Sequence, residues 1–282
     1  MKDVKRFKWS LLFCTVLLVA TNLVHSKEPS NVHPSLTDEF VLDLGMYFPE
    51  RSVTIRVDGT IAGANRDIDF EKQVGLSKSD ETFSADFGWR FGEKWSLLTQ
   101  YFQSSGTTGS VLNEDVEWND VVFGQGSNIV AGQDFSVIRA FFGRQFGTSE
   151  RHDFGLGIGL HWIEIGAFIE GEIIVDGGPS MFHRESVSAE VPLPNFGAWY
   201  RYSISPKWAF KSRVDWLNAD IGDYSGAITN IGLGVNYQMF ENFGIGLNYN
   251  ALDLDLHVNK TDWHGQFNTS YKGVFAYISA SW

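Results

Sequence analysis

The most restrictive feature of the sequence is a two-residue alternation that recurs in many segments. In the segment 243–250, every second residue is Phe, Ile, Leu or Tyr, and the residues between them are Gly or Asn. A repeat of two is the side-chain repeat of a β-strand, whereas an amphipathic helix needs a repeat near 3.6. The pattern therefore predicts an all-β fold. The same alternation is present in segments 83–91, 208–216 and 231–239.

The two faces of these predicted strands differ in a way that favours a membrane. One face carries large aromatic and aliphatic residues, and the other carries glycine, amides and ions. A soluble barrel buries its large apolar residues, whereas a membrane barrel turns them toward lipid and keeps a polar lumen. The segment 154–175 is the most apolar stretch after residue 26, but it contains three glutamates and alternating glycines, so it is not a spanning helix. We expect a transmembrane antiparallel β-barrel.

The first 26 residues have the pattern of a secretory signal peptide. Basic residues such as Lys5 and Arg6 precede the apolar run 10–20, and Val24 and Ser26 fit a cleavage site before residue 27. The apolar run is shorter than the roughly 20 residues that a spanning helix needs. We therefore expect a signal peptide at 1–26 and one barrel domain at 27–282. The only cysteine, Cys14, lies in the signal segment, so the mature chain would have no disulfide.

Short polar turns alternate with longer connections along the chain, and this alternation predicts about ten strands. A bacterial barrel has an even number of strands, with short turns on the periplasmic side and longer loops outside. A turn at 48–51 would give eleven strands, but we prefer a bend or bulge at Pro49 within one long strand. A separate hairpin within 111–130 would give twelve, and eight would require discarding clear strands. The predicted strands are 38–60, 81–92, 94–106, 130–146, 151–172, 187–204, 207–220, 224–239, 242–256 and 265–282.

Charged residues on the predicted inner faces form a candidate lumen network. An Arg or Lys facing lipid at mid-depth costs about 2–4 kcal/mol, so these residues are expected to point inward. Opposite charges inside a narrow barrel can pair and close the pore, and a narrow conductive path is the alternative. We favour the closed state because ten strands leave little interior space. The predicted network is Asp43, Asp86, Arg90, Arg201, Lys211, Arg213 and Asp215, and Arg139 is a further candidate.

Aromatic residues flank the predicted short turns, as expected for an interfacial girdle. The end of the chain alternates from Val274 to a terminal Trp282. This ending resembles the C-terminal signature of outer-membrane barrels, which the barrel assembly machinery reads, although Ala280 is smaller than usual. The predicted girdle residues are Trp95, Phe154, Trp208 and Phe243, and the predicted assembly signal is Ile278, Ala280 and Trp282.

Nearly the whole mature chain resembles known outer-membrane barrels. It is similar in pattern to the small OmpA/OmpX/OmpW-like proteins, and closer still to an uncharacterised group of Gram-negative outer-membrane barrels. The resemblance implies a barrel fold, an outer-membrane location, and lipid and lipopolysaccharide as surroundings, but no reaction. The segments that carry it are 40–49, 68–71, 75–76, 89–91, 101–102, 213–216, 221–226 and 274–282.

Motifs for catalysis or metal binding are absent from the sequence. It contains no HExxH, CxxC, EF-hand spacing or G-x-S-x-G elbow, so no catalytic, cofactor or metal residues are predicted. Acidic and histidine residues gather around the predicted loop 257–264, which we interpret as solvated; divalent-cation bridging to lipopolysaccharide phosphates has no ligand spacing to support it. The cluster comprises Asp253, Asp255, His257, Asp262 and His264.

The charge balance and the loops complete the functional expectation. The net charge of −12 argues against nucleic acid as a partner. We expect a non-enzymatic outer-membrane protein with a structural or surface-binding role, which exposes loops 61–80, 107–129 and 173–186. The alternatives are a narrow channel or, less favoured, an outer-membrane enzyme acting on lipid or peptide. A soluble ligand-binding barrel is a further alternative.

Overall fold

The protein was analysed as a computed structural model, which describes residues 31–59, 66–92, 94–173, 181–260 and 263–282. The signal peptide predicted at 1–26 lies outside the described residues. The described chain is almost entirely β-strand, with one short 3₁₀ turn, η2 (Pro34–Leu36), before the first strand. No helix among the described residues is long and apolar enough to cross a membrane. The strands are β1 (Phe40–Val57), β2 (Ile68–Asp69), β3 (Thr82–Phe91), β4 (Trp95–Val111), β5 (Val116–Trp118), β6 (Val121–Phe123), β7 (Asn128–Ser149), β8 (His152–Ile173), β9 (Met181–Ser205), β10 (Trp208–Ile221), β11 (Tyr224–Gln238), β12 (Phe243–Asn259) and β13 (His264–Ser281).

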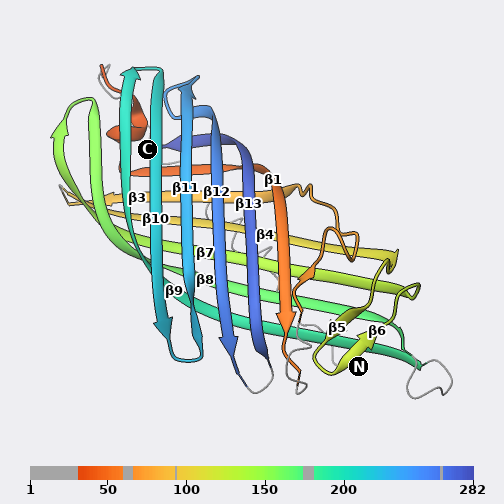
Figure 1. Cartoon of the computed structure of the whole chain (residues 1–282). Helices are drawn as coiled ribbons and strands as arrows, with labels where there is room; N and C mark the ends of the chain where they lie inside the picture. The colour runs from red at the N-terminus through yellow and green to blue at the C-terminus, as the bar shows by residue number, and fades with distance from the viewer. Residues whose placement is uncertain (1–30, 60–65, 93, 174–180, 261–262) are drawn as a thin grey trace, which may run out of the picture.

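Ten of these strands close into an antiparallel barrel (Figure 1). The main sheet has the order β13-β12-β11-β10-β9-β8-β7-β4-β3-β1-β2, and β13 also pairs with β1. The two-residue β2 adds only to the end of β1, so ten strands form the ring in the described chain. The prediction of about ten antiparallel strands is confirmed. The hairpin considered within 111–130 does form, as β5 and β6, but it makes a separate two-stranded sheet and does not enter the wall.

The first strand runs through Pro49 without interruption. Its pairing with β13 keeps one register from Val41 to Val57, so Pro49 forms no bulge with β13. Pro49 follows the last pairing between β1 and β3, at Tyr47, where a missing N–H breaks no β1–β3 ladder bond. Gly273 lies opposite Pro49, and a Cβ there would lie 2.0 Å from the carbonyl oxygen of Phe48. One long strand was predicted correctly, and the glycine lets β13 approach it closely.

The barrel has two sections of opposite polarity. In the membrane section of β12, Phe243–Tyr249 places Ile245 and Leu247 outward, both about half exposed, and turns Asn248 inward. In the outer section of the same strand, 252–258, the leucines face inward and Asp253 and Asp255 face outward. This change in polarity occurs at paired positions in neighbouring strands. It therefore marks one height along the barrel axis. The residues that flank this change on the outside are Phe48 and Glu50, Trp162 and Glu164, Trp216 and Asn218, and Val274 and Lys272.

The outer section is built as two facing layers. Pairing between β9 and β10 ends at Phe196 and Trp216, and pairing between β1 and β3 ends at Tyr47 and Thr82. Beyond these levels, β4, β7, β8 and β9 form one layer and β10 to β13 with β1 form the other. Figure 1 shows β10 to β13 running at a marked angle to β4, β7, β8 and β9.

An apolar core lies between the two layers. The rings of Phe135 on β7 and Tyr271 on β13 stack with centroids 4.9 Å apart, and Phe102 on β4 contacts Tyr271 edge-on at 5.7 Å. Leu254 and Leu256 from β12 are also buried in this core. The arrangement resembles a β-sandwich, in which two sheets bury their inner faces against each other. Sequence alternation predicted a polar lumen, and this description holds only for the membrane section.

Candidate functional site in the barrel lumen

The lumen of the membrane section contains the predicted charged residues. Inward positions of β1, β3, β9 and β10 supply Asp43, Asp86, Arg90, Arg201, Lys211, Arg213 and Asp215. Arg139 joins them from β7 and is fully buried. We call these eight residues together with Asp153 the lumen network. Its members come from six strands, so the contacts described below connect opposite walls of the barrel.

The centre of the lumen network is the ion pair between Arg139 and Asp215. The Arg139 guanidinium donates to Asp215 Oδ1 at 2.7 Å, and both side chains are fully buried. Asn195 donates to the same oxygen at 3.1 Å, and Arg213 Nε lies 3.3 Å from Asp215 Oδ2. A buried pair gains Coulomb energy but loses hydration, so its net contribution to stability is small. Removing one member is strongly destabilising, because the other charge is then buried without a partner. This pair fixes β7 against β10.

A second centre joins β1, β10 and β13. The Lys211 ammonium donates to Asp43 Oδ2 at 2.7 Å and lies 4.2 Å from the centre of the Tyr277 ring. Ser279 donates to the other oxygen of Asp43 at 2.6 Å. Both oxygens of this carboxylate therefore have a partner, as a buried charge requires.

Asp153 is a member of the network that the sequence analysis missed. Its carboxylate lies 3.7 Å from Arg90 and 3.4 Å from Arg201, and it accepts the Trp199 indole N–H at 3.0 Å. Asp153 shares its parity along β8 with the alternating glycines, and this was the signal that could have placed it inward. The Trp199 ring also explains one of those glycines, because a Cβ at Gly155 would lie 2.0 Å from it.

Asp86 is the least paired member of the network. It lies directly opposite Asp43 in the β1–β3 ladder, and its Oδ1 has no hydrogen-bond partner among the described residues. A cavity of about 110 Å³ lies beside it. Charged and amide side chains line part of this cavity, which has room for several water molecules. Its lining includes Asp43, Asp86, Lys211, Arg213, Asn236 and Asn248.

Uncharged polar residues connect these centres, and sequence reasoning named none of them. Arg213 donates to Gln100 at 2.8 Å, and Asn230 donates to the same oxygen at 3.4 Å. His161 lies beside Asn230 and is fully buried. Their inward parity could be read from the alternation, but the contacts between non-adjacent strands depend on barrel closure.

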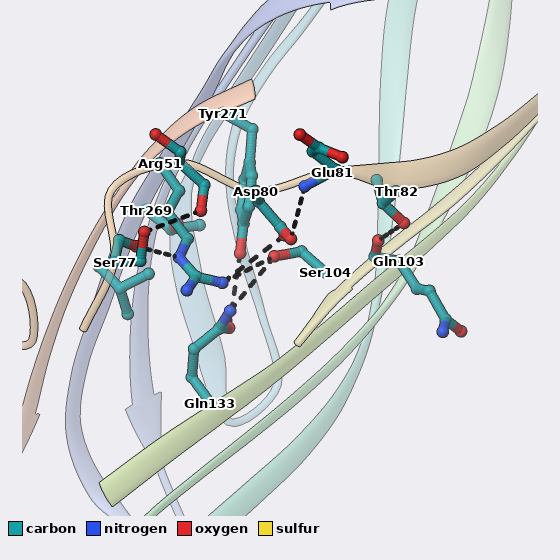
Figure 2. Close-up of polar contacts among 12 residues, drawn as sticks. Arg51, Ser77, Asp80, Glu81, Thr82, Gln103, Ser104, Gln133, Thr269 and Tyr271 are labelled. Carbon is teal, nitrogen blue, oxygen red and sulfur yellow. Dashed lines mark hydrogen bonds and ion pairs between the residues drawn. The ribbon is translucent and has the colours of Figure 1, made fainter. Parts of the chain in front are cut away.

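Above the network, Arg51 ties the first outer connection to the barrel (Figure 2). Its guanidinium donates to the carbonyl of Ser77 at 2.8 Å and to the hydroxyl of Ser104 at 3.3 Å. It lies 3.6 Å from the Asp80 carboxylate, and Gln133 on the neighbouring strand β7 donates to the Ser104 hydroxyl at 3.3 Å. The connection between β2 and β3 is therefore held against β1 and β4.

This connection and the β5–β6 hairpin correct the expectation of exposed loops. Segments 61–80 and 107–129 were expected at the surface, but the described part of each contributes to the apolar core. Part of 107–129 and of 173–186 belongs to strands β4, β7 and β9, and residues 60–65 and 174–180 lie outside the described residues. The buried apolar side chains from these segments are Ile68, Phe70, Val74, Leu76, Leu112, Val116, Trp118, Phe123 and Ile129.

The periplasmic end of the lumen is occupied by residues before β1. We call Val32–Asp38 the N-terminal plug. Val32 and Leu36 pack on Ala209 of β10, and His33 is fully buried. The backbone N–H of His33 donates to the Ser203 hydroxyl at 2.9 Å, and Arg90 donates to carbonyls of the plug. Burial lowers the pKa of His33 to about 4.

The predicted girdle residues lie on the outside near the short turns. The exposed fractions of these side chains agree with contact to lipid, which is absent from the isolated chain. They lie between 38% and 55% for Trp95, Phe154, Trp208 and Phe243. Trp95 stacks on Phe142 with centroids 4.9 Å apart, and Trp208 contacts Tyr237 at 4.8 Å.

The predicted assembly signal forms the end of the closing strand. Ile278 is 63% exposed and faces outward, and Ala280 pairs with Leu42 and Phe243. Trp282 exchanges two backbone hydrogen bonds with Phe40 and stacks on its ring at 5.5 Å.

The acidic and histidine cluster does not converge on a site. Asp253, Asp255 and His257 lie in β12 and face outward, and His257 belongs to this strand and not to the loop where it was expected. Asp253 pairs with Lys272 at 2.8 Å, whereas His264 pairs with Asp58 at 3.0 Å. Asp262 lies outside the described residues. Among the described residues, no group of three or more histidine, cysteine and acidic side chains could hold a metal ion.

No family profile matches the sequence, and no curated protein matches it either. Solved structures do match the fold. The outer membrane protease OmpT from Escherichia coli superposes with a TM-score of 0.58 at 10% identity, over 92% of this chain and 99% of that chain. The Yersinia pestis protein Ail gives 0.34 at 10% identity, over 85% and 99%, and the Pseudomonas putida toluene transporter TodX gives 0.35 at 10%, over 88% and 91%.

The chain therefore has the fold of a bacterial outer-membrane β-barrel, as the sequence predicted. The apolar belt of the membrane section agrees with that fold, and together they place the chain in the outer membrane. At 10% identity, the similarity to OmpT concerns the fold alone.

Proposed function

We propose that this protein is a non-enzymatic outer-membrane barrel with a closed lumen and a structural or binding role at the cell surface. The observation that best supports the proposal is that buried side chains lie in the lumen at three described levels. The N-terminal plug fills the periplasmic end, the lumen network crosses the membrane section, and the apolar core fills the outer section. A solute crossing the barrel would have to displace all three.

A planar-bilayer recording tests the closed lumen directly. The parent protein is expected to give no reproducible conductance steps. The Arg213→Ala variant is also expected to give none, because the Phe135 and Tyr271 rings above it still block the path. Reproducible steps whose size shifts in Arg213→Ala would support the narrow channel instead and overturn the closed lumen.

The absence of catalysis is supported by the placement of the polar residues. Asp253, Asp255 and His257 face outward, and the inward positions between them are Leu254 and Leu256. Asp255 Oδ1 lies 3.5 Å from His257 Nδ1, but both side chains are more than half exposed, so neither is held in one position beside a reacting group. Variants Asp253→Asn, Asp255→Asn, His257→Ala and His264→Ala are expected to leave lipid A composition and peptide cleavage unchanged. A change in either would favour the enzyme hypothesis.

The proposed surroundings are outer-membrane lipid and lipopolysaccharide, with the barrel assembly machinery as a partner during biogenesis. The exposed belt supports lipid contact, because residues such as Ile158 and Leu247 are 59% and 55% exposed in the isolated chain. The protein is expected to stay in the membrane fraction after a carbonate wash. Release by the wash would favour a soluble ligand-binding barrel.

A further inference from the structure

The closure at the periplasmic end depends on a histidine that must be neutral. His33 Nδ1 accepts the backbone N–H of Ser35 at 3.1 Å and lies 2.9 Å from the Ser35 hydroxyl. This contact caps the 3₁₀ turn η2. Only an unprotonated Nδ1 has the lone pair to accept that N–H. Protonation at Nδ1 would place two donors face to face and remove the cap.

The surroundings of His33 give a charged ring little compensation. The side chain is fully buried, and its Nε2 has no hydrogen-bond partner among the described residues. Loss of hydration lowers the pKa of His33 to about 4, and it outweighs the Asn236 side chain and the Asp38 and Asp43 carboxylates, which favour the charged ring. Arg90 on β3 contacts the plug, and Arg201 on β9 and Lys211 on β10 line the adjoining cavity with Ser35, so cations also face this end.

The plug also contacts the inner wall of the barrel. These contacts include the Ser203 hydroxyl, the Arg90 guanidinium on two plug carbonyls, and apolar contact between Ala209 and two plug residues. No strand of the barrel wall includes Val32–Asp38, so the plug can leave without breaking the wall.

We propose that the N-terminal plug is an acid-released gate, in which protonation of His33 frees Val32–Asp38 and opens the cavity beside Asp86 to the periplasm. The apolar core stays closed, so release creates a periplasm-facing vestibule and no through channel. This proposal rests on one part of the proposed function, namely that the plug closes the periplasmic end of the lumen.

The expected size of the effect follows from the two protonation equilibria. A free histidine titrates at pH 6.5 and the buried His33 at about 4, so the plug is fully favoured above 6.5 and loses stability as the pH falls toward 4. Between roughly pH 7.5 and pH 5, the ratio of released to bound plug is expected to rise about 30-fold.

Thiol labelling in detergent-solubilised protein tests the gate. In a Cys14→Ser background, Ala209→Cys places a reporter beneath the plug, and Lys207→Cys places a reference in the exposed β9–β10 turn. The ratio of the two labelling rates cancels the intrinsic effect of pH on thiol reactivity. This ratio is expected to rise about 30-fold between pH 7.5 and pH 5.

His33→Asn is the matched control, because its side-chain oxygen can cap η2 without titrating. With this substitution the ratio is expected to stay constant. A flat ratio in the parent protein would overturn the proposal, and so would an equal rise in His33→Asn, which would assign the opening to other groups or to unfolding. Bilayer conductance is read separately, so failure of the gate and failure of the closed lumen give different results.

Discussion

The membrane section and the outer section are built from the same strands, but the polarity of the two faces is exchanged between them. Apolar residues face outward in the membrane section and inward in the outer section. In β12, Leu247 faces lipid and Asn248 faces the lumen, whereas farther along Leu254 faces inward and Asp255 faces outward. Where lipid surrounds the wall, apolar burial is satisfied outside and the interior must be held by ion pairs and hydrogen bonds. Where water surrounds the wall, the interior becomes an ordinary apolar core. The same wall therefore depends on polar contacts at one end and on packing at the other.

The largest expected effect breaks the polar interior of the membrane section. Asp215→Leu leaves Arg139 buried without its partner, and removing one member of a buried pair costs about 3–5 kcal/mol. Urea-induced unfolding in lipid vesicles would measure the loss. The double variant Arg139→Met/Asp215→Leu removes both charges and is expected to recover most of the stability. If the double variant is as unstable as the single one, the pair does not have the role assigned to it.

The next prediction tests the change in polarity of the outward-facing positions along one strand. Val274 and Ser270 both face outward on β13, but Val274 lies in the membrane section and Ser270 in the outer section. Val274→Lys is expected to destabilise the barrel by up to about 2–4 kcal/mol, the cost at the bilayer midplane, because it places a charge against lipid. Ser270→Lys is expected to change stability by less than about 0.5 kcal/mol. Equal effects at the two sites in vesicle unfolding would contradict the boundary between the sections.

The alternation revealed the strands and the membrane section but not the exchange. A repeat of two states which residues share a face, and large rings opposite Arg213 and Asp215 were enough to choose the face toward lipid. Beyond Tyr249 the alternation continues, but the apolar residues move from the outward positions, such as Tyr249, to the inward positions, such as Leu252. Ala251 lies between them and marks no clear boundary in the sequence.

The contacts within the lumen were less predictable than the faces. Parity places Asp153 and Gln100 inward, but the contact of Asp153 with Arg90 and that of Gln100 with Arg213 join strands far apart in sequence. Closure of the ring decides those pairings, and local spacing carries no information about it. The plug at His33 was missed for a similar reason, since a segment before the first strand has no alternation to mark its place.

A smaller effect compares the two kinds of apolar surface on β8. Ile165 is 3% exposed in the apolar core, and Ile158 is 59% exposed on the lipid-facing belt. Ile165→Val is expected to cost about 0.5–1.5 kcal/mol, because the removed methylene leaves a space in a packed core. Ile158→Val is expected to cost less, because lipid chains fill the space. The same unfolding assay distinguishes them, and a larger loss at Ile158 would contradict the assignment of the two faces.

The smallest expected effect concerns the polar exterior just above the belt. Lys272 and Asp253 pair at 2.8 Å, but their side chains are 46% and 50% exposed, so water and salt screen the pair. Lys272→Ala is expected to change the free energy of unfolding by about 0.2–1 kcal/mol, and less at high salt. Asp253→Ala should match it, and the double variant should show little further loss, since both single variants remove the same contact. A loss comparable to that of Asp215→Leu would mean that the outer face, like the lumen, is held by charge, and the contrast between the two sections would fail there.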